Sequence, residues 1–344
     1  MAPFRMPAEW EPHEGTWLAW PHEKTDWPGK FQPIPWVYGE IIKRLARVER
    51  VHILVNDEEA ERRARKVLKA AHADLPSVDF VRIPTNRSWT RDFCPIFVRD
   101  ERGKPVITNW QFNGWAKYEN SQTDDAVSSQ IASTLRMRAV EPKLGRRRIV
   151  LEGGSIDVNG AGSILTTEEC LLSDVQQRNP GMSREQYEGI FEQYLGVRHV
   201  LWLHRGIAGD DTHGHVDDLA RFVNANTVAI AVEQDKADLN YEPLQENVKL
   251  LKTMTDQDGN KLRIVPLPMP EPVYFAGQRL PASYANFYIA NRLVLVPVFN
   301  DANDRVALNT LAKLFPDREV VGIYCGDLVL GLGTLHCMTQ QQIA

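Results

Sequence analysis

The sequence lacks the features that mark membrane-spanning, exported or disulfide-stabilised proteins. Its longest apolar run, 293–299, has the length of a strand and is far short of the roughly 20 residues that a membrane span needs. The first ten residues contain no apolar stretch of the kind found in secretory signals. The four cysteines, at positions 94, 170, 325 and 337, show no close-spaced disulfide framework. We therefore expect a soluble protein of the cytoplasm that has no membrane partner.

Basic residues are too scattered to indicate a nucleic-acid partner. The 344 residues include 40 Lys and Arg against 45 Asp and Glu, a net charge of −5, with no Lys or Arg stripe for phosphates. This mildly negative charge would attract a small cation. With 43% hydrophobic residues, 22 Gly and 21 Pro, the composition is that of a packed globular protein and excludes disordered, collagen-like and coiled-coil chains.

What the sequence does contain is a repeated unit: a short hairpin, an amphipathic helix and one further strand. Five copies of this ββαβ unit begin near residues 16, 95, 155, 219 and 286. The predicted strands are 16–20, 51–55 and 78–83; 95–99, 106–112 and 138–141; 155–158, 163–167 and 198–203; 220–224, 227–232 and 262–266; and 286–290, 293–298 and 319–324. An extra helix with Val37, Ile41 and Leu45 at helical spacing makes the first copy the least regular.

Each unit alone would leave a sheet edge and a helix face uncovered. A closed ring, in which each unit buries its neighbours, is the simplest solution. We therefore predict an α/β fold, a five-bladed α/β propeller with pseudo-fivefold symmetry that occupies residues 1–344 as a single domain. The alternative is a two-domain, doubly wound sheet, but the hairpins argue against a purely parallel sheet.

Unusual polar residues concentrate in the segments that join one unit to the next. These residues are Asp92, Glu152, His215, Asp217 and Cys337. Equivalent junctions of a ring emerge at the same end near its axis, so we expect the five side chains to converge, although 245 positions separate the first from the last. Glycines beside Glu152 and before Cys337 would let a ligand approach closely.

The combination of a thiol, an imidazole and several carboxylates suits attack by a thiolate on a cationic carbon. A nearby His lowers the pKa of a Cys, and the thiolate is the nucleophile. Three carboxylates around the Cys would oppose thiolate formation unless the substrate brings a positive charge. A guanidinium fits because it is planar and pairs with carboxylates in bidentate geometry.

Each candidate also has a structural interpretation. Cys337 can be a buried apolar residue, His215 a structural histidine, and Asp92 or Asp217 a cap of a helix or turn. A second chemical alternative is a metal site of Asp211, His213, His215 and Asp217. A third is a ring-shaped module that binds without catalysis, which would keep its activity after Cys337→Ser.

Several motifs along nearly the whole chain resemble the agmatine deiminases, within the family that also holds the Porphyromonas-type peptidylarginine deiminases. The motifs are Met6-Pro7-Ala8-Glu9-Trp10-Glu11-Pro12-His13-Glu14, Trp17-Leu18-Ala19-Trp20-Pro21, Ser88-Trp89-Thr90-Arg91-Asp92, Leu151-Glu152-Gly153-Gly154-Ser155-Ile156-Asp157-Val158-Asn159-Gly160, Asp210-Asp211-Thr212, Gly214-His215-Val216-Asp217, His336-Cys337 and Thr339-Gln340-Gln341. The resemblance implies the pentein fold, which agrees with the predicted ring of five units.

The resemblance also implies a reaction, in which agmatine and water give N-carbamoylputrescine and ammonia through an S-amidino-cysteine intermediate. By similarity Cys337 is the nucleophile, His215 the general acid and base, and Glu152 its partner. Asp92 and Asp217 would hold the guanidinium. Trp89 and Asp211 match positions that line the substrate pocket. The resemblance requires no metal and no organic cofactor, places the product in polyamine synthesis, and leaves a homo-oligomer open.

Three departures from the family pattern bear on the substrate. Thr334 stands in the segment before Cys337, His213 precedes the motif of His215, and Cys94 follows Asp92. Thr334 and His213 could reshape the pocket beyond the guanidinium, whereas packing is the favoured role of Cys94. The alternative function is deimination of arginine in proteins or peptides. Free arginine is less favoured, because its α-carboxylate has no assigned partner other than the untested Arg91 and Arg205.

Overall fold

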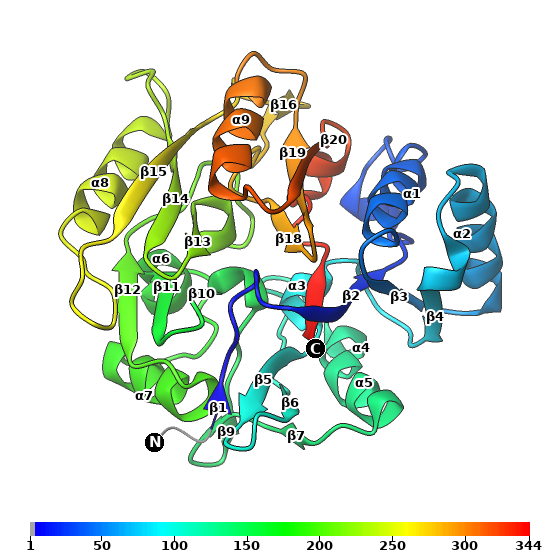
Figure 1. The fold of residues 1–344 in the computed structure, drawn as a ribbon, viewed down its shortest axis with the longest axis horizontal. Coiled ribbons are helices and arrows are strands. Elements are labelled where there is room, and N and C mark those ends of the chain that lie inside the picture. Colours follow the sequence, from blue (N-terminus) through cyan, green and yellow to red (C-terminus); the bar gives the residue numbers. More distant parts are fainter. Residues whose placement is uncertain (1–3) are drawn as a thin grey trace.

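Five sheets of three or four strands follow one another around the middle of the chain's computed structural model, which describes residues 4–344 (Figure 1). The strands, in sheet order, are β21 (Gln340–Ile343), β2 (His13–Ala19), β3 (Arg50–Val55) and β4 (Val78–Arg82); β1 (Phe4–Arg5), β5 (Ile96–Asp100), β6 (Pro105–Thr108) and β7 (Ala139–Val140); β10 (Asp157–Val158), β11 (Ser163–Thr167) and β12 (His199–Leu203); β13 (Ala220–Asn224), β14 (Thr227–Val232) and β15 (Arg263–Pro268); and β18 (Tyr288–Ala290), β19 (Leu293–Val298) and β20 (Glu319–Tyr324). Two hairpins, β8 (Lys143–Leu144) with β9 (Arg147–Arg148) and β16 (Tyr274–Phe275) with β17 (Gln278–Arg279), lie between sheets. Residues 1–3 of the predicted domain lie outside the described chain.

Helices connect the strands within and between sheets. They are α1 (Ile34–Leu45), α2 (Glu58–Ala70), α3 (Thr90–Phe93), α4 (Gln122–Asp125), α5 (Val127–Leu135), α6 (Glu168–Leu172), α7 (Arg184–Leu195), α8 (Tyr241–Leu251) and α9 (Asp304–Leu314). Helix α7 shows how the sequence sets their ends. Ser183 and Gln186 form a reciprocal capping box, and Gly196 ends the helix at a φ of 72°, which favours glycine.

The later four sheets have the predicted strand pattern. In the sheet of β13, β14 and β15, the first two strands pair antiparallel, and β14 pairs with β15 in parallel after the crossover through α8. The sheets that contain β5, β10 and β18 repeat this order. The structure is therefore an α/β fold, and the hairpin-helix-strand units predicted from residue 95 onward are present.

The first predicted unit is wrong in its pairing. Strands β2 and β3 are not a hairpin but pair in parallel, because the twelve-residue helix α1 carries the chain back across the sheet. The antiparallel neighbour of β2 is β21 from the end of the chain, while β1 from its beginning pairs with β5 (Figure 1). The two ends of the chain thus complete two different sheets.

Four predicted strands, 106–112, 138–141, 155–158 and 286–290, are shorter by two or more residues. The segment 155–158 begins as a 3-10 helix, Gly153–Ser155, in which Ser155 Oγ donates a hydrogen bond to the Glu152 carbonyl, so β10 covers only two residues. The strand predicted at 106–112 ends at Thr108. The change at 155–158 lies next to the junction segment 151–154, whereas the strand that ends at Thr108 is shortened inside the second unit.

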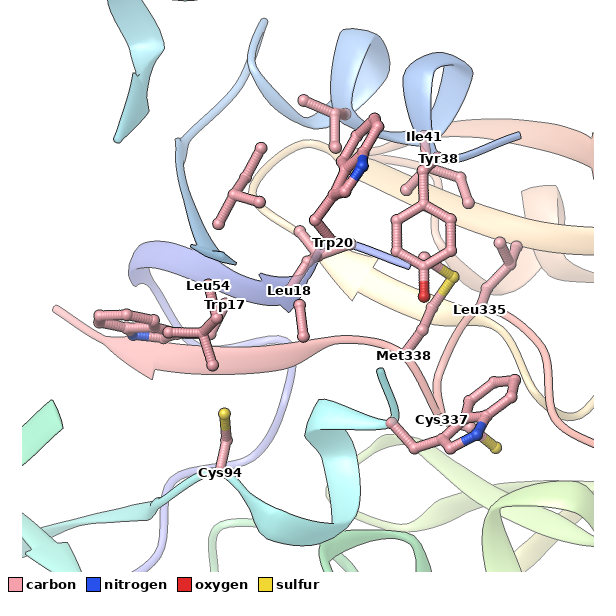
Figure 2. Packing of buried hydrophobic residues seen from close by; sticks show 14 of the residues in the cluster. Trp17, Leu18, Trp20, Tyr38, Ile41, Leu54, Cys94, Leu335, Cys337 and Met338 are labelled. Atoms are coloured by element: carbon pink, nitrogen blue, oxygen red, sulfur yellow. The ribbon is translucent and has the colours of Figure 1, made fainter. Parts of the chain in front are cut away.

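Buried apolar side chains pack between the helices and the sheets. The predicted inward-facing sides of α8 and α9 are confirmed in part, since Leu244, Leu251 and Leu311 are fully buried. Figure 2 shows one cluster, to which Trp17, Cys94 and Cys337 belong, with Cys94 and Cys337 at different edges. No helix in residues 4–344 has both the length and the apolar character required to cross a membrane.

Candidate active site

A cavity of about 400 Å³ opens next to Cys337. Its lining residues come from distant parts of the chain and are Thr25, Asp26, Pro28, Arg87, Trp89, Asp92, Trp115, Tyr118, Asp211, Thr212, Phe275, Ala276, Gln278, Leu330, Gly331, Leu332, Gly333 and Cys337. The volume is within the range of small-molecule sites. Four residues predicted from the sequence, Trp89, Asp92, Asp211 and Cys337, therefore share one cavity.

Cys337 lies in the turn that precedes β21 and is only 6% exposed. Its Sγ accepts a hydrogen bond from Asn286 Nδ2 at 3.1 Å and lies 3.6 Å from Asp217 Oδ2. Gly333 is needed beside it, because a Cβ there would lie 3.2 Å from the sulfur and 2.9 Å from the ring of Trp89. The glycine gives the thiol access to the cavity.

Asp92, in the short helix α3, presents both carboxylate oxygens to donors in the site. Oδ1 accepts from the Gly154 backbone N–H at 3.1 Å, and Oδ2 accepts from Trp115 Nε1 at 2.8 Å. Burial is the main reason why the pKa of Asp92 rises to about 6, and the carboxylates of Asp217 and Glu152 add to the rise. A cation bound against Asp92 would favour its ionised form.

His215 lies among three carboxylates. Its Nδ1 is 3.9 Å from Asp92 Oδ1 and 4.0 Å from Asp217 Oδ1, and its Nε2 is 3.8 Å from Glu152 Oε2. Neither ring nitrogen has a hydrogen-bond partner within residues 4–344. Burial opposes protonation, but Asp92, Cys170 and Glu152 raise the pKa of His215 well above its ordinary value. The raised pKa favours the protonated imidazole, which can release a proton.

Glu152 is buried and ionised behind His215. Arg178 Nε donates to Glu152 Oε1 at 3.0 Å, and both side chains are fully buried. Although burial opposes ionisation, Arg178 and His215 lower the pKa of Glu152 to about 2. Its second oxygen, Oε2, is the one that faces His215.

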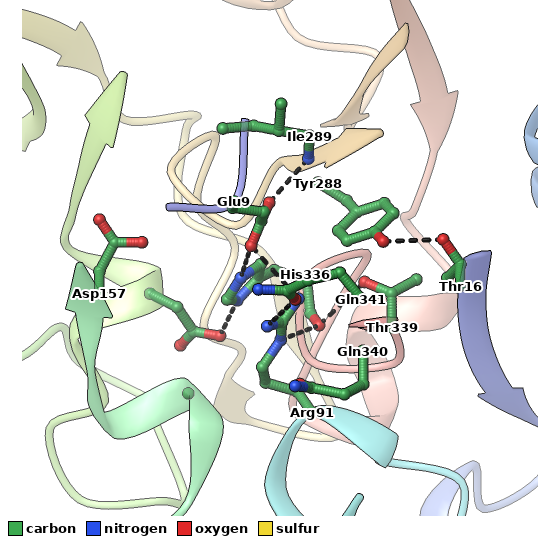
Figure 3. A network of polar contacts seen from close by, with 12 residues as sticks. Glu9, Thr16, Arg91, Asp157, Tyr288, Ile289, His336, Thr339, Gln340 and Gln341 are labelled. Atoms are coloured by element: carbon green, nitrogen blue, oxygen red, sulfur yellow. Dashed lines mark hydrogen bonds and ion pairs between the residues drawn. The ribbon is translucent and has the colours of Figure 1, made fainter. Parts of the chain in front are cut away.

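Asp217 connects the cavity region to a charged network behind it. Its Oδ2 lies 2.7 Å from His336 Nδ1, and His336 Nε2 lies 2.7 Å from Glu9 Oε2. We call the buried group Glu9, Arg91, Asp157, Arg221 and His336 the rear network (Figure 3). It joins the N-terminal segment to the turn of Cys337.

The acidic surroundings oppose ionisation of the thiol. Burial and then the carboxylates of Asp217, Asp218 and Asp92 raise the pKa of Cys337 well above its ordinary value. A cation among these acids would reverse part of the effect. The arrangement can therefore activate the sulfur when a positively charged group is bound.

The far part of the cavity carries acids that are already paired. Asp211 Oδ2 accepts from the Tyr118 hydroxyl at 2.7 Å, and Lys117 forms an ion pair with Oδ1. Asp26 accepts from Trp89 Nε1 at 3.1 Å and pairs with Arg87. Burial is the main reason why the pKa of Asp26 rises to about 6.

Four residues considered for the pocket lie outside it. His213 lies over Ser173, with Nε2 3.2 Å from its Oγ, and Thr334 Oγ1 donates to Asn286 Oδ1, so neither lines the cavity. Arg91 is part of the rear network and the exposed Arg205 pairs with Glu246, so neither can reach a substrate carboxylate there. Cys94 packs in the core, as expected.

The four residues of the alternative metal site do not come together. Asp211 pairs with Lys117, and His213 lies beside Ser173, away from His215 and Asp217. Within residues 4–344, ligand-type atoms gather within 4.8 Å of one another in two other groups, Glu152, Cys170 and His215 and then Asp217, Asp218 and Cys337. In the first group the Arg178 guanidinium already neutralises Glu152.

Other residues of the site were not predicted as functional. Asn286 contacts both Cys337 and Asp218, and nothing in its sequence surroundings marks it. Glu9 and His336 stand inside motifs of the family resemblance, so adjacency to Cys337 was a usable signal for His336. Trp115 contacts Asp92 from the loop that follows the second strand of the second predicted unit.

The fold and the site define a cysteine-centred cavity whose carboxylates suit a planar cation. A family model, Porphyromonas-type peptidyl-arginine deiminase, matches residues 5–342, and the chain belongs to this family. It is 35% identical over 364 residues to the agmatine deiminase of Pseudomonas aeruginosa (strain LESB58), covering 99% of this chain and 96% of that protein. The solved agmatine deiminase of Enterococcus faecalis superposes with a TM-score of 0.90 at 32% identity, covering 99% of this chain and 96% of that one. An amidinotransferase from Microseira wollei, 11% identical with a TM-score of 0.50 over 99% of this chain and 97% of that one, shares the fold alone.

Proposed function

We propose that the protein is an agmatine deiminase that hydrolyses agmatine to N-carbamoylputrescine and ammonia. The observation that carries this proposal is the position of Cys337 at the cavity wall, with Asp92 on the same wall and Asp217 3.6 Å from the sulfur. The names of the relatives in Pseudomonas aeruginosa and Enterococcus faecalis support agmatine as the substrate. Its product feeds polyamine synthesis.

Substrate binding prepares the nucleophile. Asp92 and Asp217 hold the guanidinium, whose positive charge offsets the carboxylates that keep the Cys337 thiol protonated. Trp89 and Asp211 contact the chain of the substrate beyond the guanidinium. The thiolate therefore forms in the complex, next to the carbon that it attacks, and the thiol proton leaves to solvent.

The reaction then proceeds in two halves. The thiolate forms an S–C bond to the guanidinium carbon, and His215, assisted by Glu152, gives a proton to the departing ammonia. The S-amidino intermediate remains on Cys337. His215 next takes a proton from water, the hydroxyl adds to the same carbon, and the C–S bond breaks as the hydroxyl proton passes to the departing sulfur, which releases N-carbamoylputrescine and restores the Cys337 thiol. His215 and Cys337 carry the proton transfers within the site, and the proposal includes no metal or organic cofactor.

We also propose that the five sheets close into a five-bladed α/β propeller with pseudo-fivefold symmetry, and that residues 1–344 form one domain. The common strand pattern of the later sheets and the joining of the chain ends to neighbouring sheets support this closure. The junction segments would then meet at one end of the ring. The cytoplasmic location and a homo-oligomer stay predictions from the sequence.

The test is ammonia release from agmatine, free arginine and a blocked arginine peptide, measured in parallel. We expect turnover of agmatine, little turnover of the other two, and none by the Cys337→Ala variant. Turnover of the peptide without turnover of agmatine would overturn the substrate. Activity that survives in Cys337→Ala and disappears with a chelator would overturn the mechanism.

A further inference from the structure

His336 occupies an unusual position between two buried carboxylates. Its Nδ1 lies 2.7 Å from Asp217 Oδ2 and its Nε2 lies 2.7 Å from Glu9 Oε2, while its side chain is 2% exposed. The backbone holds the ring in this place, because His336 N–H donates to the Asn286 carbonyl and its own carbonyl accepts from Arg91 Nε. The imidazole therefore bridges the two acids without freedom to turn away.

The two contacts require a donor on each ring nitrogen. An ionised carboxylate only accepts hydrogen bonds, whereas a neutral imidazole has a single N–H. Arg91 and Arg221 lie 3.3 Å and 3.0 Å from Glu9 Oε2, which keeps Glu9 ionised. His336 then donates to both acids as an imidazolium, and its charge lies directly behind Asp217.

The contact determines how Asp217 is presented to the cavity side. One oxygen, Oδ2, is engaged by His336, while Oδ1 has no hydrogen-bond partner within residues 4–344 although the side chain is fully buried. Oδ1 lies 4.0 Å from His215 Nδ1, and Oδ2, besides its contact with His336, lies 3.6 Å from Cys337 Sγ. A buried carboxylate oxygen without a donor costs free energy, so the fold must hold it in place.

We propose that His336 is a positioning residue, which through its Nδ1–H holds Asp217 with Oδ1 directed to the substrate guanidinium while Glu9 holds the opposite side of the ring. The proposal rests on the proposed function, since it assigns Asp217 to the guanidinium. It adds a role for the N-terminal segment, because Glu9 reaches the site only through the imidazole. His336 acts through Asp217 and does not touch the substrate.

Two amide substitutions separate the two sides of the ring. The side-chain nitrogen of Asn can take the place of Nδ1, and that of Gln can take the place of Nε2. His336→Asn should keep the contact with Asp217 and lower kcat/KM for agmatine by less than about fivefold. His336→Gln should lose it and lower kcat/KM by about tenfold to a hundredfold, the loss expected for a hydrogen bond to a charged group.

A second readout does not depend on agmatine being the substrate. 2-Chloroacetamidine carries an amidinium and alkylates a thiol with loss of chloride, whereas iodoacetamide is neutral. Mass spectrometry of the Cys337 peptide gives both rates. The ratio of the amidinium rate to the neutral rate should fall about tenfold or more in His336→Gln and stay near the wild-type ratio in His336→Asn. Should the protein not turn over agmatine, this ratio still tests the role of His336.

His13 provides the matched control. It is also a buried histidine beside a carboxylate, with Nδ1 3.5 Å from Glu49, but it has no contact with Asp217 or Cys337. His13→Asn and His13→Gln should lower the melting temperature. Neither should change the alkylation ratio or the order of magnitude of kcat/KM for agmatine. Thermal melts establish that each variant is folded.

Equal ratios in His336→Asn and His336→Gln would overturn the proposal. Should His336→Gln fail to fold, Glu9→Gln takes its place, because it weakens the far side of the ring and leaves the contact with Asp217. Glu9→Gln and His336→Asn should then both be less stable than wild type, and both should keep the wild-type alkylation ratio. A folded His336→Asn with a ratio more than tenfold below wild type would overturn the proposal.

Discussion

The two sides of Asp217 differ in how their charges are matched. On the cavity side, Asp92 and Asp217 face His215 and the thiol of Cys337, while His336 contacts Asp217 from behind. On the other side, the rear network sets Arg91, Arg221 and His336 against Glu9 and Asp157. Both regions are buried, so the difference is one of charge and not of solvent access.

The difference in charge matching indicates which side serves substrate binding and which side stabilises the fold. Buried acids without matching cations cost folding free energy, and such shortfalls are typical of binding sites, where the ligand supplies the missing charge. Buried acids that are fully paired support the fold, and breaking one pair is costly. We therefore expect changes on the cavity side to affect catalysis and changes in the rear network, apart from His336, to affect stability.

The largest effect should follow removal of the sulfur. Cys337→Ala should lower kcat at least about a thousandfold, because the covalent route is lost, while the protein stays folded. Ammonia release measures the first result and a thermal melt the second. Cys94→Ala is the matched control, since Cys94 is 5% exposed against 6% for Cys337 but packs in the core.

The control should behave in the opposite way. Cys94→Ala should keep kcat and lose about 1 kcal/mol of stability as a small core deletion. Loss of activity in Cys94→Ala together with activity in Cys337→Ala would place the nucleophile elsewhere and end the comparison of the two sides.

The second effect concerns the rear network. Arg221 is fully buried, donates from Nε to Asp157 Oδ1 at 2.8 Å and has Nη2 3.0 Å from Glu9 Oε2. Arg221→Met should lower the free energy of unfolding by about 3–5 kcal/mol, because two buried carboxylates lose their cation. Urea unfolding measures the loss, and kcat at 25 °C should fall less than about tenfold.

A surface pair provides the comparison for Arg221. Arg205 and Glu246 are about half exposed and lie 3.2 Å apart, so Arg205→Met should change stability by less than about 1 kcal/mol. A loss of kcat in Arg221→Met larger than its loss of stability would show that the rear network acts directly in catalysis.

The cavity side was largely accessible from the sequence. Asp92, Glu152, His215, Asp217 and Cys337 stand at the junctions of a recognisable repeat, and a repeat brings its junctions together. The structure places His215 within 4.0 Å of three of these carboxylates and Cys337 within 3.6 Å of one. Their roles in the reaction stay proposals.

The rear network and the first sheet could not be predicted from the sequence in the same way. Strand β21 reads Gln340-Gln341-Gln342-Ile343, a polar pattern that indicates an exposed segment, yet all four residues are buried. Gln341 accepts from Arg91 Nη1, and Gln342 accepts from Trp17 Nε1. Such partners are far apart in the chain and show no periodicity, so neither the strand nor its pairing with β2 could be predicted.

The third effect is a pH dependence of stability that comes from Asp92. Burial raises the pKa of this group from 3.8 to about 6. Between these pH values Asp92 is ionised in the unfolded chain but keeps its proton in the folded protein. The free energy of unfolding therefore falls as the pH rises, by about 3 kcal/mol at pH 7. Asp92→Asn removes this fall, and the variant should gain about 2.4 kcal/mol relative to wild type between pH 4 and pH 7.

Urea unfolding at pH 4, 5, 6 and 7 measures that gain. Asp26, with a pKa of about 6, and Asp124, with a pKa of about 7, change stability in the same direction, but they are present in both proteins and cancel in the difference. Glu152 has the opposite sign, because its pKa of about 2 means that its contribution is lost only as the pH falls below 4.5. A difference that stays constant from pH 4 to pH 7 would contradict the charge shortfall on the cavity side.

The smallest expected effect comes from filling the space between His215, Asp92 and Asp217. A Cβ on Gly154 would lie 2.5 Å from His215 Nδ1, 2.9 Å from Asp92 Oδ1 and 3.1 Å from Asp217 Oδ2. Gly154→Ala should cost about 1–3 kcal/mol of stability through overpacking and lower kcat by about tenfold to a hundredfold, because all three groups move. Gly189, inside α7, meets nothing within 4 Å, so Gly189→Ala should add about 0.5–1 kcal/mol and leave kcat unchanged. If Gly154→Ala kept both kcat and stability, the three groups would not be held as tightly as their distances indicate, and the geometry assigned to the guanidinium would have to be given up.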